Sequence, residues 1–436
     1  MAPPYKNTPA LQDLIDDALA QTAPGRCVWV ALSGGMDSSL LLSLAADACR
    51  RVPRPLFALH VHHGLQSAND DFERHCRWLC SRLGVPLIVE HVCVDNGRGE
   101  GVEAAARRAR YDAFAQHIGC GETLWLAQHQ NDQAETFLLA ALRGSGVAGL
   151  ASMPRRRTFF GITIERPLLG VALTQLEEEA HKQRLVWVND PTNSELQFDR
   201  NYVRHRVLNA LEARWPHAQA ALARSAGLVG EAAGLLDELA DHDLMQLGGQ
   251  PQQLTVSELL QLSEPRRRLL IRRCLTHLGL ALPPARRLAT LDAQLQGRTD
   301  GQAHVSWPGG EARLWRGKLF LMAPPLALAG DWQVEWCGQK VLPTPLGNLR
   351  RGLVADSGQA VSLQVCARRG GEVLHLAERG RRGLKRLLQE HGLSPWQRKQ
   401  LLVVWHDNAV VAVGLVDGEW LLVAQGWYQP SSVSGR

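Results

Sequence analysis

The sequence predicts an α/β fold, with a parallel, twisted sheet that carries helices on both faces, followed by a helical domain and a small α+β domain. Short apolar or β-branched runs alternate with amphipathic stretches from residue 26 to about 190, which is typical of a parallel sheet with crossover helices. Polar motifs stand where several of these runs end. Ligands of such sheets bind beyond the carboxyl ends of the strands, so we expect one site there.

The expected strands and helices alternate along the chain. We expect strands in the apolar runs 27–32, 56–62, 86–92, 123–129 and 162–166. We expect helices over the amphipathic stretches 39–49, 69–83, 102–118, 132–142 and 173–184. From residue 201 the sequence turns helical as far as residue 247, and a second helical block spans about 258–296.

Length and composition predict more than one domain. A chain of 436 residues exceeds what one core usually supports, and 45% hydrophobic residues leave ample material for burial. A connection that contains proline and glycine, near residues 324–348, precedes further short β-like runs. We therefore expect domains at 1–215, 216–325 and 345–436.

Charge and cysteine content indicate the kind of partner and the compartment. The formal net charge of +5 is modest, but the arginines are clustered, which favours a polyanionic partner such as nucleic acid. No apolar run reaches the roughly 18 residues of a membrane span, and the N-terminus is acidic, so we expect a cytoplasmic protein. Cys76 and Cys80 lie one helical turn apart, and reduced core cysteines are favoured over a metal pair.

The turn Ser33-Gly34-Gly35-Met36-Asp37-Ser38 follows the first expected strand and precedes a helix. Paired glycines let backbone N–H groups approach an anion, the serine hydroxyls can donate to it, and the helix start adds positive dipole. A phosphate site is therefore expected, although a turn that only caps the helix is the alternative. A Walker loop is excluded, because Gly317-Lys318 is followed by leucine.

Three histidines, His60, His62 and His63, close the second expected strand. Alternation puts His60 and His62 on one face and His63 on the other, and no cysteine or carboxylate follows at ligand spacing. We expect a polar strand end near a nucleotide rather than a zinc site.

The helix expected at 102–118 places Glu103, Arg107 and Arg110 near one face. Because the planar guanidinium group suits a phosphate that is losing its leaving group, Arg107 is the preferred contact to the α-phosphate or to RNA. A solvated charged face is the alternative.

A further polar motif, residues 127–136, leads from the fourth expected strand into a helix. Asp132 and Glu135 are one turn apart there, so that one carboxylate can hold Mg²⁺ and the other an amine. Residues 144–149 match the dinucleotide fingerprint in spacing, but they follow an expected helix. We expect a loop that meets substrate.

The order of these motifs resembles a known family. The turn at 33–38 is similar to the pyrophosphate loop (PP-loop) of N-type ATP pyrophosphatases. Together with the motifs at 60–65, 103–111, 127–136, 141–150, 166–169, 190–193 and 200–204, it resembles the bacterial tRNA(Ile)-lysidine synthetase family over roughly residues 26–210. Residues 368–372, 384–390 and 395–398 resemble that family's C-terminal RNA-binding domain.

The resemblance implies a reaction and its partners. ATP would adenylate O2 of the wobble cytidine in the CAU anticodon of tRNA(Ile), and the ε-amine of free L-lysine would then attack C2 and expel AMP. Such an enzyme uses ATP and Mg²⁺ and needs no protein nucleophile, because the RNA oxygen and lysine are the nucleophiles. A homodimer is left open.

The resemblance also implies roles for particular residues. Ser33 to Ser38 would hold the ATP phosphates, and Asp37 would serve Mg²⁺ and adenylation. Arg107 and Asp132 would line the reacting phosphate, and Glu135 would contribute to the lysine pocket. Many members have two histidines and two aspartates where this chain has Gln128-His129 and Asn131-Asp132, so His129 is a weaker catalytic candidate.

Basic residues are the expected tRNA contacts. The segment 367–400 is rich in arginine and lysine, and it contains Trp396, which is available to stack on a base. The arginines of 266–273 are a solvated face or a further nucleic-acid contact. The expected tRNA-binding residues are Arg143, Arg204, Arg368, Arg369, Lys385, Arg386 and Arg398.

Two other functions remain as alternatives. A tRNA thiolase or another PP-loop ligase would incorporate sulfur or use a different nucleophile, and sulfur transfer is disfavoured because the chain has no Cys-x-x-Cys motif. A non-catalytic tRNA-binding module would release no pyrophosphate, and the intact turn at 33–38 argues against it.

Overall fold

The computed structural model describes residues 10–64, 68–94, 101–297, 303–358 and 361–430. The chain divides into two compact units, Met1–Leu236 and Asp237–Arg436, which we call the first and the second unit. The division into domains at 1–215, 216–325 and 345–436 stays a prediction.

A six-stranded sheet organises the first unit, in the order β3-β2-β1-β4-β6-β5. All neighbours pair in parallel except β5 and β6, so the expected α/β class is confirmed. The strands are β1 (Val28–Ala31), β2 (Leu56–His62), β3 (Leu87–His91), β4 (Thr123–Trp125), β5 (Arg156–Phe159) and β6 (Ile162–Glu165).

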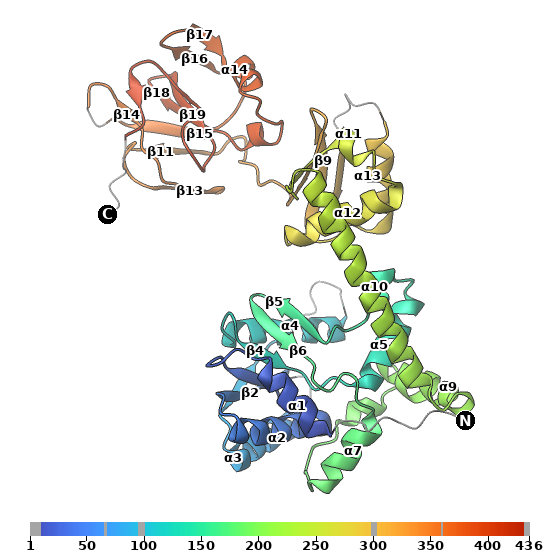
Figure 1. Cartoon of the computed structure of the whole chain (residues 1–436). Helices are drawn as coiled ribbons and strands as arrows, with labels where there is room; N and C mark the ends of the chain where they lie inside the picture. The colour runs from blue at the N-terminus through green and yellow to red at the C-terminus, as the bar shows by residue number, and fades with distance from the viewer. Residues whose placement is uncertain (1–9, 65–67, 95–100, 298–302, 359–360, 431–436) are drawn as a thin grey trace. The chain divides into compact units, whose positions relative to one another are not determined.

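Helices cover both faces of this sheet (Figure 1). Val28 and Val30 of β1 face a core formed with α1, α2, α3 and α7, whereas Trp29 between them faces the core beneath α4. Both faces of β1 are thus buried, which explains its uninterrupted apolar sequence. The helices are α1 (Leu11–Ala20), α2 (Met36–Arg51), α3 (Ala68–Leu83), α4 (Val102–His117), α5 (Gln130–Leu142), α6 (Val147–Leu150), α7 (Leu173–Lys182), α8 (Asp199–Tyr202) and α9 (Asn209–Arg214).

Several elements of the first unit were not expected, among them α1 and β5. Helix α1 packs its Ile15 and Leu19 on the core of α2, and β5 adds an antiparallel edge to β6. The pattern of β5 is difficult to recognise because Arg156 and Thr158 are polar and the strand pairs on one side only. The strand expected over 123–129 ends at Trp125, which leaves residues 126–129 to approach α5 as irregular backbone.

The second unit begins within the long helix α10 (Ala218–Gln246) and contains two larger sheets. The first is antiparallel, in the order β7-β10-β9-β8, and shares a core with α12 and α13. Residues 304–322 therefore form strands within the region expected to be helical, because Val305 and Trp307 alternate with exposed residues. The elements are β7 (Gln253–Thr255), α11 (Val256–Leu259), α12 (Glu264–His277), α13 (Ala285–Leu295), β8 (His304–Trp307), β9 (Gly310–Trp315) and β10 (Lys318–Met322).

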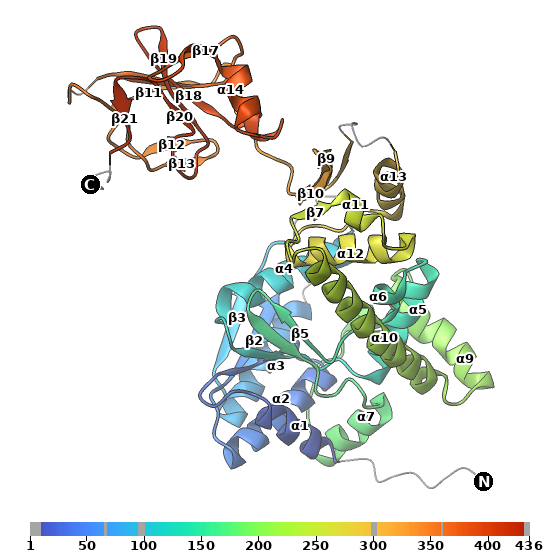
Figure 2. The same cartoon turned by 45° about the horizontal axis from the view of Figure 1, so that its top comes forward.

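The other sheet has the order β11-β15-β18-β19-β16-β17, with β20 paired to β19. Figure 2 shows α14 beside its strands, where Leu384 and Leu388 pack on Val403 and Val413. The elements are β11 (Gln333–Trp336), β15 (Leu363–Ala367), β16 (Val373–Leu376), β17 (Gly380–Gly383), α14 (Leu384–Glu390), β18 (Leu402–His406), β19 (Ala409–Gly414) and β20 (Leu422–Val423). Two further two-stranded antiparallel sheets pair β12 (Leu342–Thr344) with β13 (Gly347–Leu349) and β14 (Val354–Ala355) with β21 (Trp427–Tyr428).

The arginine run of α12 has a structural role that sequence analysis did not predict. Arg267 is buried, and its Nε lies 2.8 Å from Oδ1 of Asp292 on α13. Arg266 and Arg273 bind aspartates of α10, with Arg273 Nη2 2.6 Å from Asp241. These arginines join α12 to its neighbouring helices instead of forming a free basic face.

Within the described ranges, none of the helices has both the length and the apolar character that crossing a membrane requires.

Candidate active site

The turn at 33–38 joins β1 to α2 and is held by its own serines. The Ser33 N–H donates to Oγ of Ser38 at 3.1 Å, and the two hydroxyl oxygens lie 2.9 Å apart. Gly35 is the N-cap of α2, with φ −76°, and its N–H donates to Ser33 Oγ at 3.3 Å. The first backbone N–H groups of α2, which have no partner within the helix, therefore lie at this turn. An anion site requires such free donors.

Gly34 is required by both conformation and space. Its φ is +91°, and a Cβ atom there would lie 3.0 Å from the Phe72 ring, 3.3 Å from the Phe72 carbonyl and 3.2 Å from Cys76 Sγ. Phe72 and Cys76 belong to α3, so this helix packs directly behind the turn. Cys76 and Cys80 are both buried, and burial raises the pKa of the Cys76 thiol and raises that of Cys80 to about 12.

Replacing Gly34 by alanine is expected to lower the free energy of unfolding by about 1–3 kcal/mol, because the positive φ is strained for alanine and α3 must shift. Thermal unfolding measures the effect. Gly35→Ala is the matched control, since its φ is negative and its Cβ would meet only Ser33 Oγ at 3.6 Å. Equal losses in both variants would contradict this explanation.

Asp37, in the first turn of α2, carries a carboxylate with an unused oxygen. Its Oδ1 is buried and makes no hydrogen bond among the described residues, while Oδ2 lies 3.8 Å from His129 Nε2. Burial raises the pKa of the Asp37 carboxyl, an effect that His129 only partly offsets. A buried carboxylate oxygen without a donor fits a hard cation such as Mg²⁺.

His129 is the N-cap of α5 and is almost fully buried. The Asn131 N–H donates to His129 Nδ1 at 3.3 Å, so the proton of the neutral ring is on Nε2. This Nε2 lies 3.8 Å from Asp37 and 3.5 Å from Asp132. The imidazole thus bridges the carboxylates that follow β1 and β4.

Asp132 stands at the edge of this cluster with 15% of its side chain exposed. It accepts the His129 N–H at 3.0 Å and lies 2.9 Å from Arg200 Nη2. Although burial opposes ionisation, His129 and Arg200 lower the pKa of the Asp132 carboxyl. Asp132 is therefore ionised at neutral pH.

Glu135 has no exposed surface and binds two arginines. Arg200 Nε lies 2.7 Å from Oε2 and Arg204 Nε 2.6 Å from Oε1. Arg200 is in α8, and Arg204 follows in a π-helical segment, η2 (Val203–Leu208). The role of Arg200 was not predicted from the sequence. Its signal is the spacing of four between two arginines, which matches an acidic pair on a second helix.

The two departures from the family pattern have structural roles. Gln128 Oε1 accepts a hydrogen bond from Nε of Arg166, which is buried and also donates to the Pro154 carbonyl at 2.7 Å. Asn131 Oδ1 accepts the N–H of Leu173, the first residue of α7, at 3.2 Å. The side-chain amides of Gln128 and Asn131 thus connect α5, and the segment that leads into it, to neighbouring segments.

Other expected site residues of the first unit lie outside this network. Arg107 is exposed on α4, with its guanidinium 5.1 Å from the centre of the Tyr111 ring. Arg143, at the C-cap of α5, is exposed beside the loop that leads to α6. The segment 144–149 follows a helix as expected, and α6 begins at Val147.

The basic residues expected to bind tRNA in the second unit differ in exposure. Lys385 and Arg386 are exposed on α14. Arg398 donates to the Leu393 carbonyl at 2.9 Å, Arg369 donates to Gln333 at 2.9 Å, and Arg368 Nε lies 3.7 Å from Glu372. Trp396 is not available to stack on a base in this structure, because its ring is 8% exposed and packs edge-on against Phe320, with ring centres 5.2 Å apart.

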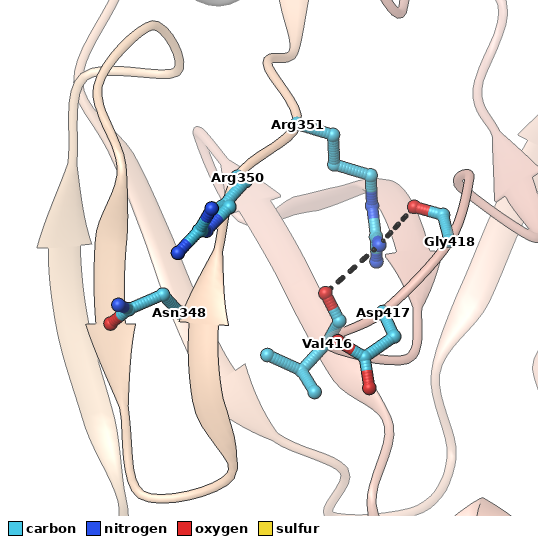
Figure 3. Close-up of a pocket in the computed structure, with 6 residues that line it drawn as sticks. All are labelled: Asn348, Arg350, Arg351, Val416, Asp417 and Gly418. Atoms are coloured by element: carbon cyan, nitrogen blue, oxygen red, sulfur yellow. Dashed lines mark hydrogen bonds between the residues drawn. The ribbon is translucent and has the colours of Figure 1, made fainter. Parts of the chain in front are cut away.

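A cavity of about 540 Å³ in the second unit is lined by none of the expected site residues (Figure 3). Arg351 donates to the carbonyls of Val416 at 3.3 Å and Gly418 at 2.6 Å, and it stacks on Trp420. Burial lowers the pKa of Arg351 to about 10. Arg351 therefore fastens the turn after β19, and the cavity lies beside this structural arginine.

Comparison with known proteins assigns three parts of the chain to described domains. A family model described as a PP-loop domain matches residues 7–211, which contain the turn, Asp37, His129, Asp132 and Glu135. Models described as the TilS substrate binding domain and the TilS substrate C-terminal domain match residues 254–320 and 363–426.

Curated relatives cover nearly the whole chain. The tRNA(Ile)-lysidine synthase of Xanthomonas axonopodis pv. citri is 43% identical over 405 residues, 91% of this chain and 90% of the relative. The chain belongs to the tRNA(Ile)-lysidine synthase family. The enzyme of the same name from Pseudomonas putida is 40% identical over 431 residues, 93% of this chain and 96% of the relative.

Membership of the tRNA(Ile)-lysidine synthase family makes the chain a ligase with an ATP-binding PP-loop domain. The expected enzyme class is confirmed, and the thiolase and binding-module alternatives are not favoured. Among solved structures, the U34-tRNA thiolase NcsA from Methanococcus maripaludis matches 51% of this chain and 78% of its own, with 15% identity and a TM-score of 0.42.

Proposed function

We propose that the enzyme joins L-lysine to C2 of the wobble cytidine in the CAU anticodon of tRNA(Ile), in the cytoplasm. Cytidine O2 attacks the α-phosphorus of ATP and pyrophosphate leaves. The lysine ε-amine then attacks C2, the C2–O2 bond breaks, and AMP and a proton are released. Family membership and the meeting of Asp37, His129 and Asp132 beside the turn at 33–38 support this reaction.

The turn at 33–38 is proposed to hold the ATP phosphates. The start of α2 supplies backbone donors and positive dipole where negative charge accumulates on the leaving pyrophosphate. Asp37 is proposed to hold Mg²⁺ with its unpaired Oδ1, and the cation would neutralise phosphate charge. Arg107, exposed on α4, is proposed to reach the α-phosphate or the RNA.

Asp132 is the carboxylate we assign to the lysine ammonium. Its side chain is 15% exposed, although the His129 N–H and Arg200 contact its two oxygens, whereas Glu135 has no exposed surface and is bound by two arginines. The amine of free lysine has a pKa of about 10.4, so it arrives protonated and must lose a proton before attack. A contribution of Glu135 to the lysine pocket requires an arginine to move, and we propose that its main role is to position Arg200 and Arg204.

Arg143 and Arg204 of the first unit, and Arg368, Arg369, Lys385, Arg386 and Arg398 of the second, are proposed tRNA contacts. Lys385 and Arg386 are exposed neighbours on α14, so they are the first to substitute. A homodimer stays a prediction, which the mass of the protein in solution tests.

The test is pyrophosphate release from ATP with unmodified tRNA(Ile) bearing CAU, with and without L-lysine, followed by mass analysis of the tRNA. We expect release that depends on this tRNA and a mass gain equal to lysine minus water. Methionine tRNA, which shares the CAU anticodon, is the control and should support little release. Sulfur gain would favour a thiolase, and tRNA binding without release would favour a binding module.

A further inference from the structure

Three ligand-type side chains meet at the carboxyl edge of the sheet, outside the network of Asp37 and Asp132. His62 ends β2 and is the register partner of His91, which ends β3. Glu73 of α3 completes the group, and one ligand atom from each of the three residues lies within 4.8 Å of the others. The two imidazole rings have centres 4.6 Å apart.

The other histidines of the motif are used differently. His60 is buried, and its Nδ1 donates to the Leu32 carbonyl at 2.8 Å. His63 follows the last residue of β2, whereas His62 ends the strand and is the histidine of this motif that groups with Glu73 and His91.

The spacing of this group suits a tetrahedral metal ion. Glu73 Oε2 lies 3.3 Å from His91 Nε2, and Asp70 Oδ1, also on α3, lies 3.3 Å from His62 Nε2. Zinc bound to nitrogen and carboxylate oxygen at about 2.0–2.2 Å separates neighbouring ligands by roughly 3.3–3.5 Å in a tetrahedron. Four ligands of a tetrahedral ion define six ligand-to-ligand distances. Two of these six therefore already have the length that a bound ion requires.

The chemistry of the donors selects the ion. Imidazole suits zinc and related transition metals, whereas Mg²⁺ prefers oxygen ligands and its own water. Glu73 also binds Arg77, but through Oε1 at 2.8 Å, which leaves Oε2 directed at His91. Arg77 can thus orient the carboxylate while its other oxygen binds metal.

We propose that His62, Glu73 and His91 bind one Zn²⁺, with Asp70 as the fourth ligand. The ion joins α3 to β2 and β3. Because Phe72 of α3 lies directly behind Gly34, this connection also supports the turn at 33–38. The proposal reverses the sequence-based expectation, which found no ligands at short spacing after the histidines. Glu73 and His91 lie 11 and 29 positions beyond His62, on two other elements.

The test uses the full chain after removal of metal by a chelator. Zn²⁺ is titrated by calorimetry, and Co²⁺ is used as a spectroscopic probe of coordination. We expect one equivalent bound, a higher melting temperature with Zn²⁺, and the strong visible absorption of tetrahedral Co²⁺. His91→Ala and Glu73→Gln should each weaken binding at least about 10-fold, the loss seen even for groups that only support a ligand.

His117→Ala is the matched control. His117 Nε2 lies 2.8 Å from Glu90 Oε2, which is a histidine–carboxylate pair of the same unit outside the proposed site, so its loss should leave zinc affinity unchanged. Unchanged affinity in His91→Ala would overturn the proposal. A thiolate-to-cobalt charge-transfer band would also overturn it, because the exposed thiol of Cys93 would then be a ligand.

Discussion

Asp37→Asn is expected to slow tRNA-dependent pyrophosphate release by about 10²–10³-fold, the cost of losing one preorganised electrostatic group. The folded protein should be at least as stable as the original. Desolvation and the neighbouring Asp132 raise the pKa of Asp37, so its ionised form is disfavoured by folding and opposes stability above that pKa. Asparagine has the same shape without this charge. Steady-state kinetics and thermal unfolding at neutral pH measure the two effects.

The control for Asp37→Asn is Asp47→Asn on the same helix. Asp47 is exposed and paired with Arg50, so neither activity nor stability should change appreciably. Excess Mg²⁺ provides a second check, since a lost metal ligand raises the Mg²⁺ concentration needed for half-maximal rate. An Asp37→Asn enzyme with full activity would rule out the proposed role of this carboxylate.

Glu135→Gln is expected to destabilise the first unit by about 3 kcal/mol, at the lower end of the range for a broken buried ion pair because both guanidinium groups reach solvent. For a unit of this size the melting temperature should fall by roughly 6–12 °C. Glutamine keeps the volume but cannot neutralise Arg200 and Arg204. Calorimetry or circular dichroism gives the melting temperature.

Glu179→Gln is the matched control, because Glu179 pairs with the exposed Lys182 at 3.3 Å and should matter by less than about 1 kcal/mol. Adding Arg204→Met to Glu135→Gln removes one of the stranded charges and should restore part of the lost stability. A Glu135→Gln protein as stable as the original would contradict the stabilising role proposed for the Glu135 carboxylate.

Much of the first unit was predictable because its signals are local. Val28, Trp29 and Val30 are apolar on both sides of one strand, which occurs when helices cover both faces of a sheet. The turn at 33–38 and the motif at 127–136 lie at strand ends. In the structure, His129 Nε2 lies within 4 Å of a carboxylate oxygen of Asp37 and of Asp132. Sequence position and fold topology together predict this part of the site.

Other contacts were not predictable, because their partners are distant in sequence. Arg200 binds Glu135 across 65 positions, and Arg273 binds Asp241 across 32. A basic run looks the same whether it meets solvent, RNA or buried carboxylates, so composition alone cannot separate these cases. Trp396 illustrates the same point, since its burial depends on Phe320 in another sheet.

The position of Cys76 behind Gly34 has a practical consequence for chemical labelling. Its thiol is buried and resists ionisation, so thiol-reactive dyes should modify exposed cysteines first and spare the turn. Cys120 and Cys337 are exposed in different units, and backbone donors lower the pKa of Cys337, which makes it the faster to react. In a Cys93→Ser background these native thiols would accept a donor and an acceptor fluorophore, so that energy transfer could follow the two units during catalysis.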